Sequence, residues 1–404
     1  MKKSSLVCFI FCFLSLLVSP SPGQDQAEVT VTNIIVPVRV LEDRNFIDNL
    51  TAEEFELFED GVPQKIEALY LVRNGMVERK EGDQDFMPRT TRNFHLLFQM
   101  TDYNPKLAEM IDHLFQQVLI AGDTLAIQTP MKNYSLSPQA LASKTKKTLA
   151  EEMNSLLKKD IKTGSTEYNS LFRDLKRIVS SLSGTSLMAD MEGDFSASSM
   201  GLENSLNRYR ETVTKMEEQR LMDERKIIRF AHALKRIEGQ KQVFLIYQRE
   251  FRPEISPVVL NNLRSLYQEN PAIMSGLQDL FQLYTRDLSV NVELLKKAFA
   301  DASINFNFIF MNKVPEYVSG VVLREQSEDI FEAFSQITHA TGGFVDTSQN
   351  PASSFKSAVE NASVHYLLYY SPKNYQKDNK FKNIKVTVKK PSYTVQHRLG
   401  YFAN

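Results

Sequence analysis

The chain has 404 residues and a formal net charge of −1 at pH 7, with 42% hydrophobic and 24% charged residues. This composition is that of a globular protein with enough apolar side chains for a substantial core, and the length suggests two or three structural units. Because there is no basic excess to neutralise phosphates, nucleic-acid binding is not expected.

Residues 1–23 have the features of a secretory signal peptide. Two lysines precede an apolar run at 6–18, which is shorter than the roughly 20 residues that a membrane-spanning helix needs. Small residues then fit a cleavage site near Gly23 and Gln24. We therefore expect a secreted or periplasmic protein that contacts the membrane only through this segment, before cleavage. An uncleaved N-terminal anchor is the alternative.

Both cysteines of the sequence, Cys8 and Cys12, lie inside the predicted signal peptide. The mature chain would therefore have no thiol, which excludes disulfide bonds and cysteine-zinc sites. No later stretch of the sequence is long and apolar enough to predict a transmembrane helix.

Residues 24–77 are predicted to form a β-module. Apolar residues alternate at 34–40, as in a strand with one buried face. Thr51 and Glu54 have the spacing of a capping box at the start of a helical turn. The Asp-Gly pair at 60–61 lies between two apolar segments, which predicts a tight hairpin turn.

The polar segment 78–91, which follows the β-module, is predicted to be a linker. The acidic residues of the module could in principle bind calcium, but their spacing is not that of an EF-hand loop. A solvated acidic face is therefore favoured for Glu53, Glu54, Glu56, Glu59 and Asp60.

Residues 92–363 carry an α/β pattern. Strands are predicted at 93–100, 123–129, 242–248, 304–311 and 343–347, and the apolar runs at 93–100 and 242–248 predict buried strands. Helices are predicted at 105–119, 291–302, 328–339 and 351–362, with two more within 249–287, on either side of Asn270-Pro271. The strand-helix-strand order at the start of this region predicts a right-handed parallel crossover.

The middle of this region is predicted to be helical, with a helical insertion at about 183–290. Amphipathic segments at 139–159 and 164–182 come first. Residues 202–237 then indicate one long helix of roughly 54 Å, which would lie on the sheet with its C-terminal half. The alternative is a coiled-coil arm for a partner or for self-association, with an apolar seam that includes Leu206, Val213 and Met216.

Two motifs at opposite ends of the chain point to one family. The first is LTAEEFELFEDGVPQKI at 50–66. The second starts with Gly342-Gly343 and continues with a short helix, the aromatic strand HYLLYYS at 365–371, an alternating strand at 381–389 and a closing Gly-Tyr-Phe. In this order they resemble the bacterial von Willebrand factor A-related (VWFA-related) domain family.

The resemblance implies an α/β fold with a von Willebrand A-like, doubly wound, mostly parallel sheet that has helices on both faces. The C-terminal strands, at 364–404, are expected to pair antiparallel and to join the N-terminal strands in a small β-sandwich-like module. Domains of this family usually carry a metal-ion-dependent adhesion site, whose ligands lie on three loops at the carboxyl edge of the sheet.

The resemblance also shows which metal ligands this chain lacks. The first loop of the family has Asp-x-Ser-x-Ser, but here Gln99, Thr101 and Tyr103 stand at those positions. The second loop keeps a hydroxyl at Thr166, in Gly-Ser-Thr at 164–166. The third loop has Gln-Arg-Glu at 248–250 instead of Asp-Gly. A hard cation prefers carboxylate oxygens, so neither Mg²⁺ nor another cofactor is expected.

We therefore predict a degenerate metal site in which Thr101, Asp102 and Thr166 are remnants. Asp102 or Glu250 could still supply a ligand if the register differs by a residue. The same loops are the candidate surface for a protein partner, with the residues Gln99, Tyr103, Asn104, Gln248, Arg249 and Glu250.

Catalysis has little support in the sequence. There are 6 His residues, and none forms the His-x-x-x-His spacing of a zinc hydrolase. Neither a Gly-x-Ser-x-Gly elbow nor a phosphate-binding glycine-rich loop is present. The sequence thus predicts a non-enzymatic, metal-independent protein-interaction module. The alternatives are a Mg²⁺-dependent adhesion module and a structural or oligomeric component that uses the helix at 202–237.

Overall fold

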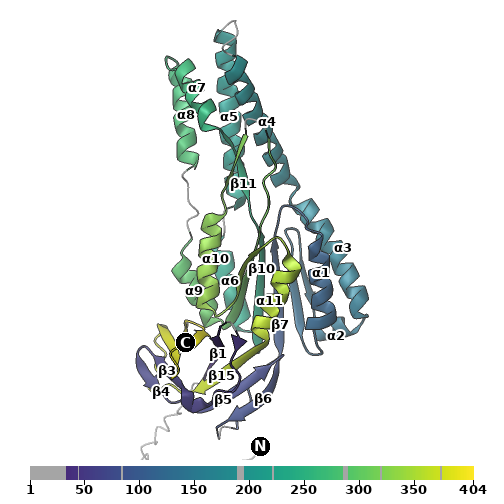
Figure 1. The fold of residues 1–404 in the computed structure, drawn as a ribbon, viewed down its shortest axis with the longest axis vertical. Coiled ribbons are helices and arrows are strands. Elements are labelled where there is room, and N and C mark those ends of the chain that lie inside the picture. The colour runs from purple at the N-terminus through teal and green to yellow at the C-terminus, as the bar shows by residue number, and fades with distance from the viewer. Residues whose placement is uncertain are drawn as a thin grey trace, which may run out of the picture. The chain divides into compact units, whose positions relative to one another are not determined.

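A computed structural model describes most of the chain after residue 32 as a mixed α/β protein (Figure 1). The predicted signal peptide, residues 1–23, lies outside the described residues. None of the helices in the described part combines the length and apolar character that a membrane crossing requires. The described ranges are 33–43, 45–82, 85–188, 195–220, 223–284, 290–318, 321–373 and 375–404.

Strands from both ends of the chain form two small sheets, which together we call the β-module. The first has the order β17-β1-β15-β5-β6, with β2 beside β1, and the second has the order β18-β16-β3-β4. The bounds are β1 Ile34–Glu42, β2 Asn45–Phe46, β3 Phe55–Glu59, β4 Val62–Gln64, β5 Ala68–Arg73, β6 Met76–Glu81, β15 Val364–Tyr370, β16 Phe381–Val388, β17 Thr394–His397 and β18 Gly400–Phe402.

The antiparallel pairing of the two chain ends confirms the prediction for the last strands. The first strand, β1, pairs with β15 and β17, and β3 pairs with β16. The alternating apolar side chains at 34–40 are buried, as expected. Tyr370 and Tyr401 both donate hydrogen bonds to Glu59 Oε2, at 2.6 and 2.9 Å, which joins the C-terminal strands to β3.

The local turn predictions in the β-module are also confirmed. Thr51 and Glu54 form a capping box around the short helix η1, Ala52–Glu54. Asp60 and Gly61 both have positive φ and connect β3 to β4. The predicted linker is partly wrong, because β6 extends to Glu81 and pairs with β5. The residues of β6 alternate between exposed and half-buried, and most of them are charged. The sequence therefore has no apolar alternation that would predict this strand.

A mostly parallel sheet lies at the centre of the α/β part. Its strand order is β14-β12-β10-β7-β8-β9. All neighbours pair in parallel except β8 and β9, which are antiparallel. The predicted strands are confirmed, and so is the parallel pairing of the first crossover, although β14 is mostly half-buried. The bounds are β7 Arg92–Gln99, β8 Thr124–Gln128, β9 Asn133–Leu136, β10 Gln240–Gln248, β12 Ile304–Met311 and β14 Val345–Ser348.

Helices cover both faces of this sheet. One face packs against α1 Lys106–His113, its π-helical continuation η2 Leu114–Val118, α3 Lys146–Gly164 and α11 Pro351–Ser363. The other face packs against α6 Glu224–Lys235, α9 Val292–Asp301 and α10 Glu328–Ala340. Aromatic side chains of β12 fill this second layer, where Phe306 and Phe308 each contact Phe334 of α10.

The helix predicted at 139–159 is two helices, α2 Pro138–Ala142 and α3. Ser143 is the C-cap of α2, and the Thr145 hydroxyl accepts a hydrogen bond from Thr148 N at 3.2 Å, so it caps α3. Thr145 lies between apolar residues at helical spacing, which is why the periodicity suggested a continuous helix.

The long helix predicted at 202–237 is also two helices, α5 Phe195–Arg220 and α6. The Asp223 carboxylate accepts a hydrogen bond from Lys226 N at 3.1 Å and so caps the start of α6. As predicted, the C-terminal half lies on the sheet, because α6 packs against β12 and α9. The other half packs against α4 Thr166–Met188 and α8 Pro271–Tyr284 (Figure 1).

The helices outside the sheet layers share a separate apolar core. It combines α4, α5 and α8 with α7 Pro257–Leu266 and includes Ile255 of β11 Phe251–Ile255. In turn, β11 pairs with β13 Val321–Glu325. The predicted insertion at 183–290 therefore has different limits, since α4 belongs to this core while α6 and β10 belong to the sheet. The seam residues proposed for self-association are buried within the chain: Leu206, Val213 and Met216.

Candidate functional site

The carboxyl ends of β7 and β10 meet at the position predicted from the sequence. The side-chain oxygen of Gln248, at the end of β10, accepts hydrogen bonds from Thr101 N at 3.0 Å, Thr101 Oγ1 at 3.1 Å and Asp102 N at 2.9 Å. Parallel neighbours end at the same sheet edge, so the two loops come together although 147 residues separate them. Gln248 therefore holds the loop that follows β7 in place.

The start of α4 joins the same loop cluster. Asn169 of α4 donates one hydrogen bond to Thr101 O at 3.1 Å and another to Ser165 Oγ at 3.2 Å. Thr166 lies nearby, but its hydroxyl donates to Lys162 O at 3.2 Å, one helical turn earlier. The predicted second loop is thus adjacent to the first, although the Thr166 hydroxyl donates its hydrogen bond to a backbone carbonyl and not to the first loop.

Two cations occupy this edge of the sheet. Lys313, which follows β12, forms an ion pair with Asp102. Arg249 pairs with Glu325 at 3.1 Å and also lies over the ring of Phe310, 5.3 Å from its centroid. Both side chains are about 31% exposed, so part of their charge reaches the surface at this edge of the sheet.

The residues predicted as an interaction surface divide into exposed and buried groups. Gln99 is exposed, and Tyr103, Asn104 and Arg249 are half-buried at the surface. Asn104 Nδ2 donates to Gln349 O at 3.1 Å, which connects the loop to the end of the sheet near β14.

Two of the predicted surface residues are buried. Gln248 is 8% exposed and Glu250 is 6% exposed, so a partner cannot contact them directly. The prediction was wrong for these two residues, because the strand direction places their side chains beneath the loops. Glu250 is held by its backbone, where its N–H donates to Ser327 Oγ at 3.2 Å and its carbonyl accepts from Gln326 N at 3.2 Å.

Sequence reasoning missed a network of buried charges beside these loops. Arg252 of β11 donates to Glu254 at 2.7 Å and to Glu217 of α5 at 3.2 Å, and Arg324 of β13 donates to Glu254 at 2.9 Å. The Arg-x-Glu spacing is the signal, because residues two apart share one face of a strand. This spacing was overlooked because two helices, and no strand, were predicted within 249–287.

The loop cluster has little of the chemistry that catalysis needs. Across the described ranges, no group of three or more His, Cys, Asp or Glu side chains could hold a metal ion. His95 of β7 is packed against the ring of Phe230, and burial lowers its pKa to about 4. His113 lies on α1 and contacts Phe355, away from the loop cluster.

Comparison with known proteins gives no family. No protein-family model matches the sequence, and no curated protein matches it. Among solved structures, the human COPII-coat protein Sec24c is similar with a TM-score of 0.30 and 7% sequence identity. That similarity covers 78% of this chain and 44% of Sec24c, so the chain spans less than half the length of that protein.

Substituting Gln248 tests how the loops are held. In Gln248→Ala, two backbone N–H groups and the Thr101 hydroxyl lose their common acceptor. We expect the free energy of unfolding to fall by about 1–3 kcal/mol, because buried donors left without an acceptor are costly. Urea unfolding measures it, with Gln99→Ala, an exposed glutamine on β7, as the matched control. Equal effects of the two substitutions would contradict this account.

Proposed function

We propose that this protein is a non-enzymatic protein-interaction module with a von Willebrand A-like fold, related to the bacterial VWFA-related family, which binds its partner without a metal ion. The partner would contact the surface residues Gln99, Tyr103, Asn104 and Arg249, of which Gln99 is exposed and the other three are half-buried. The predicted signal peptide favours a secreted or periplasmic location.

The arrangement of the central sheet supports this fold proposal. Numbered by their order along the chain within this sheet, the strands run 3-2-1-4-5-6 from β9 to β14, with helices on both faces. Such doubly wound sheets bind ligands at the carboxyl ends of their strands, where the order reverses. In this chain that point lies between β7 and β10, which carry the loop cluster.

The observation that carries the metal-independent proposal is the use of Gln248. Its carboxamide oxygen accepts from the Thr101 hydroxyl and from two backbone N–H groups, so a neutral amide that supplies no negative charge stands beside the remnant hydroxyl. The nearby carboxylate, Asp102, is paired with Lys313. Mg²⁺ would have to displace an ammonium group and would gain mostly neutral oxygens, which is unfavourable for a hard cation.

Thermal unfolding of residues 24–404, with EDTA and then with excess Mg²⁺, Mn²⁺ or Ca²⁺, tests the metal-independent proposal. We expect the same melting temperature in every condition. An ion present at a hundred times its dissociation constant would stabilise the fold by about 2.7 kcal/mol, a shift of a few degrees. Such a shift in the wild type, lost in Thr101→Ala or Thr166→Ala, would overturn the proposal in favour of a Mg²⁺-dependent adhesion module.

The interaction surface is tested in EDTA with immobilised protein and an extracellular or periplasmic extract. A partner retained by the wild type should be lost with the double variant Tyr103→Ala/Arg249→Ala. The control is Lys385→Ala, which removes an exposed cation on β16. Retention that is the same for all three proteins would mean that binding, if any, uses another surface.

A further inference from the structure

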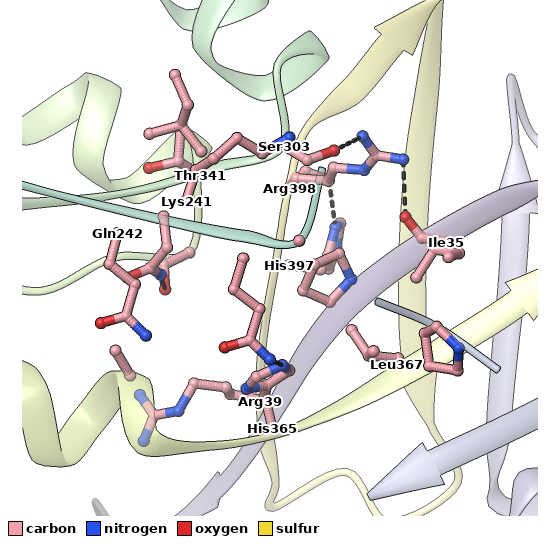
Figure 2. Close-up of a pocket in the computed structure, with 18 of the residues that line it drawn as sticks. Ile35, Arg39, Lys241, Gln242, Ser303, Thr341, His365, Leu367, His397 and Arg398 are labelled. Atoms are coloured by element: carbon pink, nitrogen blue, oxygen red, sulfur yellow. Dashed lines mark hydrogen bonds between the residues drawn. The ribbon is translucent and has the colours of Figure 1, made fainter. Parts of the chain in front are cut away.

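A cavity of about 370 Å³ lies at the opposite end of the sheet, between the amino ends of its strands and the β-module. Side chains from β1, β10, β15 and the segment 396–398 line it (Figure 2). Its volume is within the roughly 300–1,000 Å³ typical of small-molecule pockets. Nothing in the resemblance to a metal-dependent adhesion domain predicts a site here.

Four cationic side chains line this cavity, and one of them, Arg89, forms an ion pair with Glu238. Arg398 and Lys241 are each only 7% exposed. Arg398 donates to Ile35 O at 2.8 Å and to Ser303 Oγ, while its Nε has no hydrogen-bond partner among the described residues. Lys241 Nζ donates to Ile237 O at 3.0 Å. Arg39, the remaining cation, donates to the Val364 carbonyl and the Gln396 side chain, both at 3.3 Å.

All of these acceptors are neutral, and the carboxylates nearby are already engaged. Glu238, which also lines the cavity, forms an ion pair with Arg89. Asp301 is close enough to affect Lys241 and Arg398. However, its two oxygens accept from Lys235 Nζ at 2.9 and 2.8 Å, and one of them also accepts from Phe402 N. Buried cations without a paired anion are costly, so the presence of both Lys241 and Arg398 in this cavity requires an explanation.

The titration of these groups reflects their burial. The pKa of Lys241 is lowered to about 8, mainly by burial and also by the charge of Arg398, while Asp301 acts in the opposite direction. Burial also lowers the pKa of Arg39 to about 10. In the same cavity, burial and then the charge of Arg39 lower the pKa of His365 to about 4. A bound anion would oppose each of these effects.

We propose that this cavity binds a small organic oxyanion, whose carboxylate or phosphate head pairs with Lys241 and Arg398, while Arg39 adds a further positive charge on the cavity wall. The neutral walls indicate what the rest of the ligand resembles. They include Ile35 and Pro37 of β1, Leu367 of β15 and Ile304 of β12. A short hydrocarbon body would bury apolar surface against them, at a gain of about 25 cal/mol per Å². The ligand class is therefore an amphiphilic anion rather than an inorganic ion.

Thermal unfolding of residues 24–404 in EDTA, at constant ionic strength, tests the proposal with hexanoate, hexyl phosphate, inorganic phosphate and the neutral analogue hexanamide. We expect hexanoate, hexyl phosphate or both to raise the melting temperature by a few degrees. Hexanamide and inorganic phosphate should have little effect. The better of the two head groups identifies the source as a carboxylic acid or a phosphate ester. Equal shifts with hexanamide, or no shift with either organic anion, would overturn the proposal.

The response should be lost in Lys241→Met and in Arg398→Gln, and retained in the matched control Lys385→Gln on the surface of β16. Arg39→Gln is a further variant in case a buried substitution prevents folding, because Arg39 is only half-buried. Binding should also weaken as the pH rises through about 8, since Lys241 then loses its proton. A response unchanged in all three cavity variants, or independent of pH, would contradict the assignment. Because no divalent ion is involved, this result is independent of the proposed loop surface.

Discussion

Replacing Asp123 with alanine should lower the free energy of unfolding by about 3–5 kcal/mol, because it leaves the buried guanidinium of Arg92 without its counter-ion. The two side chains are 3% and 5% exposed. They form two hydrogen bonds, at 3.1 and 2.6 Å. Asp123 also accepts from Ile120 N at 2.8 Å, so the same carboxylate holds the turn before β8.

Urea unfolding of Asp123→Ala measures this loss, and Glu293→Ala is the matched control. Glu293 also forms an ion pair, with Lys296 at 2.7 Å, but its side chain is 66% exposed. Solvent screens such a pair, so the control should unfold at nearly the same urea concentration as the wild type. A small effect of Asp123→Ala would mean that water or a rearranged side chain replaces the carboxylate.

Gly343→Ala should be similarly damaging, with a loss of roughly 3 kcal/mol or more, since the change forces backbone to move. A Cβ at Gly343 would lie 1.7 Å from the carbonyl oxygen of Phe306, in the middle of β12. Gly342, just before it, has a φ of +69°, as expected for the turn that leaves α10. The glycine pair noted in the sequence therefore lets this turn pass directly against the sheet.

Gly184→Ala provides a control of opposite sign. Gly184 lies within α4, and a Cβ there would have no neighbour within 4 Å. Alanine is favoured over glycine inside a helix, so this variant should be unchanged or more stable by up to about 1 kcal/mol. Melting temperatures of the two variants measure the contrast. If Gly343→Ala had the same melting temperature as the wild type, the close approach of Gly343 to the Phe306 carbonyl would be contradicted.

The elements that the sequence predicted well are those with an unambiguous apolar pattern. The strands at 242–248 and 304–311 are rich in apolar residues because helices cover both faces of the central sheet. The alternation at 34–40 predicted β1 equally well, because one face of that strand is buried in the β-module. In these segments the apolar pattern itself indicates which side chains are buried. The strands could therefore be predicted without knowing which distant residues contact them.

The elements that were not predicted from the sequence depend on polar side chains that cap helices or form buried ion pairs. Thr145 and Asp223 each cap a helix. Asp223 interrupts the apolar seam, but the helical spacing resumes beyond both residues, so one helix was predicted where there are two. In β11, Arg252 and Glu254 are buried because they pair with each other, and a charged residue gives no sign of burial in a sequence.

The candidate site could be located from the sequence, but not its internal contacts. The strand order predicts that the loops after β7 and β10 meet, since they follow neighbouring parallel strands. Whether Gln248 points at Thr101 or at solvent depends on strand register and side-chain direction, which a single sequence does not specify. The cationic cavity could not be predicted from the sequence at all, because Arg39, Lys241 and Arg398 come from distant parts of the chain.

The pairing of the two chain ends has a consequence for how the polypeptide acquires its structure. Arg39 and Val364 are hydrogen-bonded across 325 residues, and β3 reaches its partner β16 over a similar distance. The α/β crossovers are closer along the chain, so we expect them to form first, while the β-module closes last. A nascent or truncated chain that lacks β15–β18 would leave β1 and β3 with unpaired backbone edges, which favours aggregation. A chain that contains β15–β18 can therefore close the β-module, whereas a chain that ends before β15 cannot.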